Sequence, residues 1–94
     1  MDTKKYIEAL DAVLKERYDE NSYCLSGYQE ESVCLQYQNG SWLVYDGERG
    51  NHYNEIKCDT ILKACMEIFR KMTHRIEDIS IMENELLLHL AKVA

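Results

Sequence analysis

The chain has 94 residues, of which 46% are hydrophobic and 30% charged, and its formal net charge is −6. This length gives one small domain with a single core, residues 1–94. No stretch approaches the ~18 apolar residues that a membrane helix needs, and the segment Met1–Lys5 lacks the apolar run of a secretion signal. We therefore expect a cytoplasmic protein that has no membrane partner.

The N-terminal segment has the pattern of an amphipathic helix that runs from Lys4 to about Tyr18. Its apolar residues recur at steps of three and four, which places them in one stripe, while charged residues occupy the opposite face. The polar run Asp19–Ser22 ends the helix. The predicted stripe consists of Tyr6, Ile7, Leu10, Val13, Leu14 and Tyr18.

The central segment predicts a sheet. Its first three strands are predicted over Tyr23–Tyr28, Val33–Gln38 and Ser41–Asp46. A turn cluster, Glu48–Asn51, follows. His52–Lys57 is a candidate fourth strand, and the sequence leaves its pairing open.

The Asn39-Gly40 pair is the clearest local signal in the chain. Asn-Gly supplies the two positive φ values of a type I′ turn, and this turn predicts a register in which Gln38 opposes Ser41 and Tyr37 opposes Trp42. Because side chains alternate along a strand, one face of the hairpin should lie against the core: Val33, Leu35, Tyr37, Trp42 and Val44. The other face, expected near water, carries Cys34, Gln36, Gln38, Ser41, Leu43 and Tyr45.

Two helices are predicted after the sheet. Asp59 is the expected N-cap of a helix over Thr60–Met72, and Ser80 with Glu83 fits a capping box for the last one. The last helix is unusually rich in leucine. A fully docked helix is favoured, and a homodimer seam through Leu86 and Leu90 is the alternative. The fold class is thus α+β, an antiparallel sheet of three to four strands with all three helices on one face.

The cysteines and histidines do not form a recognised site. Cys24, Cys34, Cys58 and Cys65 contain no C-x-x-C pair and match no zinc spacing. We expect no metal, no cofactor and no catalytic site. Free thiols in a reducing cytosol are the expected state, two disulfides in a secreted domain are the alternative, and a thiol enzyme that pairs Cys24 or Cys34 with His52 is a further one.

The negative charge is concentrated between Asp19 and Glu55. That segment contains seven acids and one base, Arg49, whereas the rest of the chain has ten of each. It also contains five of the seven tyrosines and the only tryptophan. Nucleic-acid binding needs Lys and Arg against phosphate, so this charge disfavours it. The charge fits a basic protein partner, although polar turns that simply collect Asp and Glu are the alternative.

The expected partner-binding surface combines aromatic residues with carboxylates. Aromatic residues are enriched where binding energy concentrates, and nearby carboxylates would attract a basic partner. For each tyrosine, ordinary packing in the sheet is the alternative. The candidate contact residues are Tyr28, Glu30, Glu31, Tyr45, Asp46, Glu48, Arg49, Tyr53 and Glu55.

A family resemblance extends over about residues 20–72. In order, the chain has a strand Ser41–Tyr45, an E-R-G turn at Glu48–Gly50, a Y-N pair at Tyr53–Asn54 and an A-C step at Ala64–Cys65. This order resembles small bacterial immunity proteins of polymorphic-toxin systems, including contact-dependent growth inhibition. The resemblance implies an acidic cytosolic inhibitor without activity of its own, which neutralises a cognate toxin domain, often a nuclease, by binding it.

The leading hypothesis is therefore an immunity protein whose partner is a toxin domain with a basic surface. The alternative is a small regulatory or adaptor module that forms homodimers through its leucine-rich last helix.

Overall fold

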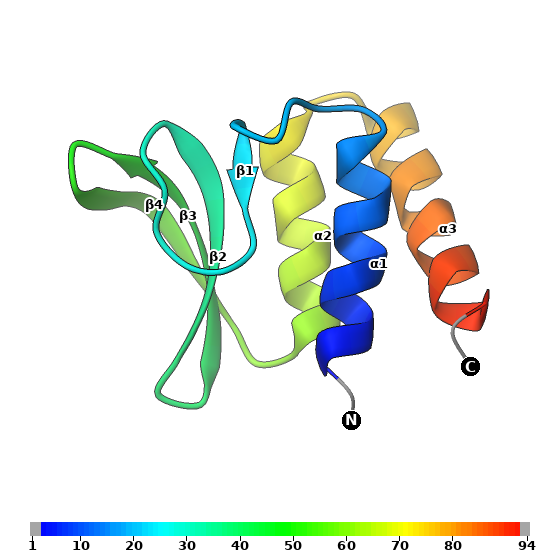
Figure 1. The fold of residues 1–94 in the computed structure, drawn as a ribbon, viewed down its shortest axis with the longest axis horizontal. Coiled ribbons are helices and arrows are strands. Elements are labelled where there is room, and N and C mark those ends of the chain that lie inside the picture. The colour runs from blue at the N-terminus through cyan, green and yellow to red at the C-terminus, as the bar shows by residue number, and fades with distance from the viewer. Residues whose placement is uncertain (1–2, 93–94) are drawn as a thin grey trace.

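The computed structural model describes residues 3–92, and in this part of the chain three helices lie on one side of a four-stranded sheet (Figure 1). The predicted α+β class is confirmed. Helix α2 packs on β2, β3 and β4, whereas α3 packs on α1 and α2. The elements are α1 (Thr3–Lys15), β1 (Tyr23–Cys24), β2 (Ser32–Gln38), β3 (Ser41–Glu48), β4 (Asn51–Cys58), α2 (Ile61–Met72) and α3 (Ile76–Lys92).

The β2–β3 hairpin has the predicted turn and register. Asn39 and Gly40 have φ values of 51° and 79°, as a type I′ turn requires. Gln38 opposes Ser41, and the pairing continues without a shift to Ser32 opposite Gly47. The two turn residues therefore determine which side chains of this hairpin face the helices.

The fourth strand pairs with β3 over its length, antiparallel, and forms one edge of the sheet. A bulge interrupts the pairing between Val44 and Asp46. On β4 the bulge includes Asn54, which has a φ of 52°. Asparagine is one of the few residues other than glycine that adopt this conformation readily.

The first strand differs from its prediction. It has only two residues, and it pairs parallel to β2, with Tyr23 opposite Val33 and Cys24 opposite Cys34. The sheet is therefore mixed and not purely antiparallel. Residues 25–28, predicted to continue the strand, belong instead to a loop, 25–31, which crosses the outer face of the sheet and turns at Gly27, where φ is 117°.

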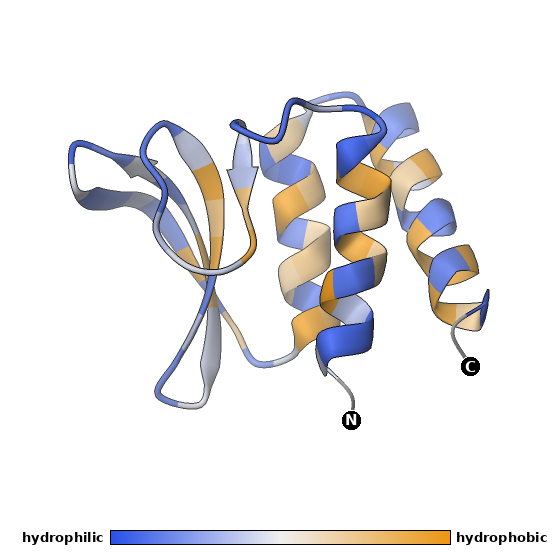
Figure 2. Ribbon diagram, viewed as in Figure 1, coloured by the Kyte–Doolittle hydropathy of each residue, from blue (hydrophilic) through white to orange (hydrophobic). Residues whose placement is uncertain are grey.

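The core lies between the sheet and the helices. The sequence of α2 predicts an inward stripe of Ile61, Cys65, Ile68, Phe69 and Met72, and most of this stripe is buried in the core. Ile61, Cys65, Ile68 and Phe69 are buried there together with Leu35 and Val44 of the hairpin. Tyr37, predicted for the core face, is instead 59% exposed, because the tip of the hairpin bends away from the helices (Figure 1). Figure 2 shows hydrophobic segments in the middle of β2 and β3 and hydrophilic hairpin tips.

The outer face of the sheet is not a water-exposed face at its centre. Cys34, Leu43 and Tyr45 form a second buried cluster there, covered by the loop 25–31. Gly47 permits this cover, because a Cβ atom at position 47 would overlap the carbonyl oxygen of Gln29. The same atom would approach Cys34 Sγ to 3.1 Å and Tyr28 Cε2 to 3.2 Å.

Both C-terminal helices begin at other residues than predicted. Thr60, not Asp59, is the N-cap of α2: its hydroxyl accepts a hydrogen bond from the backbone N–H of Lys63 at 3.2 Å. Helix α3 begins at Ile76, a full turn before Ser80, so Ser80 lies inside the helix. Glu77 and Asp78 in its first turn favour that earlier start through the helix dipole.

Helix α3 is docked on one side only. Met82 and Leu86 are fully buried, and Ile79 and Leu90 pack against the core. Leu87 and Leu88, by contrast, are 53% and 61% exposed. The prediction of a fully docked helix was therefore wrong, and the pair Leu86 and Leu90 cannot form a surface seam, because these side chains already fill the space between α3 and the rest of the core.

Replacing Gly47 with alanine tests the close contact on the outer face. The added methyl group meets the backbone of Gln29, so the loop 25–31 must move, and we expect the free energy of unfolding to fall by about 1–3 kcal/mol, as for other overpacked sites. Urea unfolding of Gly47→Ala measures the change, and Ser41→Ala on the same strand is the control. A change within about 0.5 kcal/mol, typical of open surface positions, would contradict the contact.

Candidate functional site: the acidic end of the sheet

Acidic side chains gather at the end of the sheet where β2 begins and β3 ends. A hollow of about 310 Å³ lies there, and it is called the acidic hollow below. It is lined by Ser22, Glu31, Ser32, Val33, Asp46, Gly47 and Glu48. Three of these seven residues are acids and none is a base. The charge that the sequence places in one segment is thus also gathered in space.

The carboxylates of Glu31 and Glu48 are the exposed charges of this hollow. Both side chains are exposed, and neither takes part in an ion pair within residues 3–92. Glu31 is held in a left-handed conformation, with a φ of 53°, at the point where the loop enters β2. These two side chains are therefore available to a cation from outside the molecule.

Tyr28 and Glu30 fasten the loop 25–31 to the β3–β4 turn. The Tyr28 hydroxyl donates to Glu30 Oε2 at 3.0 Å and accepts from the Gly50 backbone N–H at 2.6 Å. Glu30 Oε1 accepts from the backbone N–H of Arg49. The carboxylate of Glu30 and the phenol of Tyr28 thus connect the loop to a turn some twenty residues later in the chain. Glu30 has a positioning role in addition to its charge, and the Tyr28 ring remains exposed.

Asp46 faces the helices and has partners within the fold. Its Oδ2 accepts from Lys71 Nζ of α2 and from Asn54 Nδ2 of the bulge, both at 3.2 Å. The Lys71 side chain is largely buried. A buried ammonium that loses its carboxylate is strongly destabilising. Asp46 therefore contributes to the hollow and also neutralises a lysine that the fold has buried.

Tyr45, a predicted contact residue, is fully buried and lies out of reach of a partner. Its hydroxyl donates to Gln36 Oε1 at 2.6 Å. Its ring stacks on His52 with 3.6 Å between centroids and 8° between planes. The reason is the alternation along β3: Tyr45 points to the outer face, where the loop and His52 cover it.

The other predicted contact residues, Arg49, Tyr53 and Glu55, are not among the residues that line the hollow. Tyr53 is exposed on β4 and pairs in register with Asp46. Glu55 Oε1 lies 2.9 Å from His52 Nδ1, so it interacts within its own strand. Arg49 is exposed at the turn with a φ of 52°, and its guanidinium forms no ion pair with residues 3–92. Arg49 is thus one base beside several acids.

Three of the four thiols, those of Cys34, Cys58 and Cys65, are buried and are poor candidates for nucleophiles. Burial raises the pKa of Cys34 and of Cys58, and it raises that of Cys65 to about 12. A cysteine acts as a nucleophile through its thiolate, which a raised pKa disfavours. Cys34 instead donates to the carbonyl oxygens of Gln29 and Ser32. Within residues 3–92 no cluster of His, Cys, Asp and Glu is placed to hold a metal ion.

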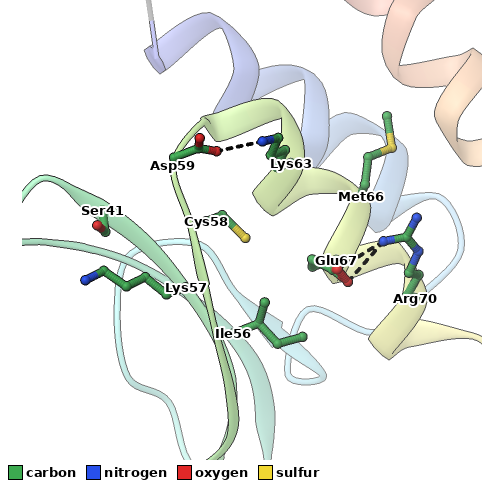
Figure 3. Close-up of a pocket in the computed structure, with 9 residues that line it drawn as sticks. All are labelled: Ser41, Ile56, Lys57, Cys58, Asp59, Lys63, Met66, Glu67 and Arg70. Carbon is green, nitrogen blue, oxygen red and sulfur yellow. Dashed lines mark hydrogen bonds and ion pairs between the residues drawn. The ribbon is translucent and has the colours of Figure 1, made fainter.

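A larger hollow, of about 570 Å³, lies between β4 and α2 (Figure 3). No local pattern in the sequence points to this hollow, because it arises only when the edge strand passes beside the helix. Four of its five charged side chains are paired with one another: Asp59 with Lys63 at 3.0 Å, and Glu67 with Arg70 at 3.0 Å. The fifth, Lys57, forms no ion pair with residues 3–92. It is lined by Ser41, Ile56, Lys57, Cys58, Asp59, Lys63, Met66, Glu67 and Arg70.

Comparisons with protein-family models, curated proteins and solved structures find no match for this chain. Over residues 3–92, no helix has the length and apolar character needed to cross a membrane.

The buried tyrosines predict how stability changes in alkali. Burial raises the pKa of Tyr45 to about 12, and burial and the hydrogen bond to Asp11 do the same for Tyr23. In the unfolded chain both titrate near ~10, so above that pH the folded state binds more protons than the unfolded state. The stabilisation is complete below about pH 10 and is lost as the pH rises toward about 12.

Tyr45→Phe removes one of these groups. The free energy of unfolding of this variant should fall less steeply than that of the wild type between about pH 10 and 12. Loss of the hydrogen bond to Gln36 lowers the stability at neutral pH but does not change this slope. Urea unfolding at stepped pH measures the slope, and Tyr53→Phe, at an exposed position, is the control. Equal slopes for Tyr45→Phe and the wild type would contradict the assignment.

Proposed function

We propose that this protein is an inhibitor that binds a basic partner protein through the acidic end of its sheet. The observation that carries the proposal is the acidic hollow, in which Glu31 and Glu48 are exposed beside Asp46 and no lining residue is basic. A field of one sign at a concave surface attracts and orients an oppositely charged protein and speeds its association.

The surroundings of the hollow suit protein recognition. Tyr28 and Tyr53 are exposed near it, and tyrosine is among the residues in which binding energy concentrates. Tyr28 is held by hydrogen bonds to Glu30 and Gly50, so little conformational freedom is lost when a partner covers it. Ordering costs of this kind otherwise weaken association.

The resemblance to immunity proteins supplies the class of partner. On this proposal the partner is a toxin domain with a basic surface, such as a nuclease whose substrate cleft attracts phosphate. The protein acts in the bacterial cytoplasm, where it neutralises the toxin by binding and performs no chemistry itself. The raised thiol pKa values agree with that last point.

The structure shows which acidic residues can be changed to lysine without disturbing the fold. Reversal of Asp46 would place a positive charge beside the largely buried Lys71 and disturb the fold. Glu31 and Glu48 are exposed and outside the ion pairs of residues 3–92. Their reversal changes the field of the hollow with little effect on stability.

The double variant Glu31→Lys/Glu48→Lys should bind the toxin domain more slowly. We expect the association rate constant to fall by about tenfold or more at low salt, and the wild-type rate, but not the variant rate, to fall with added salt. Tagged protein first captures its partner from the source cells, and mass spectrometry identifies it. Surface plasmon resonance then measures the association rates of the wild type and the variant.

The control is Glu8→Lys, which makes at one position, on an exposed face of α1, the charge reversal that the double variant makes at two.

Neutralisation is tested in cells. Expression of the captured partner's domain should arrest growth, co-expression of the wild-type protein should restore it, and the double variant should restore it less well than Glu8→Lys. A partner that is harmless on its own would contradict the immunity assignment. Equal association rates for the double variant and the wild type would contradict the role of the acidic hollow.

A further inference from the structure

Helix α3 has an outer face that nothing in residues 3–92 covers. The exposed residues of the helix are Ile76, Glu77, Ser80, Ile81, Asn84, Leu87, Leu88, Ala91 and Lys92. Four of these are large aliphatic residues. An exposed helix face normally carries mostly charged and polar side chains, so this composition is typical of a face that another helix covers.

The charges of this face lie at its two ends. Glu77 is in the first turn of α3 and Lys92 is its last residue. The other acids of the helix, Asp78, Glu83 and Glu85, are only partly exposed, and Glu85 pairs with Arg17, in the turn that follows α1. The central part of the outer face therefore carries no charge.

The face is complementary to itself when a second copy lies antiparallel to it. The midpoint between Glu77 and Lys92 falls between residues 84 and 85, and the midpoint between Ile81 and Leu88 falls at the same place. A twofold axis at that point brings Glu77 of each copy beside Lys92 of the other and packs Ile81 against Leu88. In a twofold dimer each contact occurs twice, which is the requirement of an isologous interface.

The spacing along the helix fits such a pair. Ile81, Asn84, Leu88 and Ala91 follow one another at steps of three, four and three, the repeat by which paired helices interlock. Asn84 lies next to the axis. A parallel arrangement would place Glu77 against Glu77 and Lys92 against Lys92, so the charges favour the antiparallel one.

We propose that the outer face of α3 binds a second copy of this chain, with the two α3 helices antiparallel. The 17 residues of α3 extend over about 26 Å, and a single helix pair buries less than the ~1,200 Å² of the smaller specific interfaces. The dimer is accordingly a weak one, with a dissociation constant in the micromolar range. It does not depend on the proposed inhibitor function, because α3 and the β3–β4 turn lie at opposite ends of the molecule (Figure 1).

Sedimentation equilibrium over a range of concentrations tests this proposal. The average mass of the wild type should rise from that of one chain toward that of two. Leu88→Glu and Ile81→Glu should each weaken the dimer about tenfold or more, since they place a charge in the apolar centre. Both positions are exposed, so circular dichroism should report a folded chain. Leu62→Glu, at an exposed leucine of α2, is the matched control and should dimerise as the wild type does.

A charge swap tests the orientation. Lys92→Glu places two negative charges together at each end of an antiparallel pair and should weaken it. Adding Glu77→Lys to the same chain should restore the dimer, because opposite charges meet again. A wild type that stays monomeric at every concentration overturns the proposal, as does a Leu88→Glu variant that dimerises like the wild type. Failure of the double swap to restore the dimer overturns the antiparallel arrangement.

The dimer and the proposed inhibitor function can be tested separately, because different variants affect them. Leu88→Glu should weaken the dimer and leave association with the toxin domain unchanged. Glu31→Lys/Glu48→Lys should slow that association and leave the dimer intact.

Discussion

The loop 25–31 can lie on the outer face of the sheet only because position 47 carries no side chain. The Gln29 carbonyl occupies the space that any Cβ atom of residue 47 would need. From this contact follow the burial of Cys34, Leu43 and Tyr45 and the approach of Tyr28 to the β3–β4 turn. The sheet thereby has a core on both faces, a large one against the helices and a small one beneath a loop.

The same arrangement gives the acidic end of the sheet its fixed shape. Turns rich in acids are ordinarily mobile and solvated. Here Glu30 and Tyr28 accept hydrogen bonds from the backbone N–H groups of Arg49 and Gly50, and Asp46 is held by Lys71 and Asn54. Some carboxylates are thus used to order the backbone, which leaves Glu31 and Glu48 exposed at a rigid rim. A preorganised surface of this kind loses less entropy on binding than a flexible one.

Two surfaces of different character lie at opposite ends of the molecule (Figure 1). The end of the sheet is concave and acidic, and it suits fast association with a basic protein. The outer face of α3 is apolar in its centre and has one charge of each sign at its ends, which suits a weak twofold contact. Because the helical layer separates them, the proposed dimer would present two acidic ends, and the proposed inhibitor would hold two partner molecules without either contact interfering with the other.

Local patterns in the sequence determined the elements and much of the register. Asn39-Gly40 dictates a type I′ turn by its backbone preference, and the alternation of side chains then decides the face of each residue from Ser32 to Glu48. The stripe of α2 predicts its buried residues because helical periodicity alone brings them together. The gathering of charge in the acidic hollow follows from the same register, because the pairing of Ser32 with Gly47 brings Glu31 near Glu48. These features depend on interactions between near neighbours.

Only the tertiary structure decided the features that join distant segments. Whether Tyr45 is a contact or a core residue depends on the loop 25–31, whose path depends in turn on Gly47, and no local pattern records that relation. The parallel pairing of β1, the exposure of Tyr37 and the division of the leucines of α3 into buried and exposed have the same origin. Periodicity gives the direction of a side chain relative to its own element, but what lies in that direction is set by the packing of elements remote in the sequence.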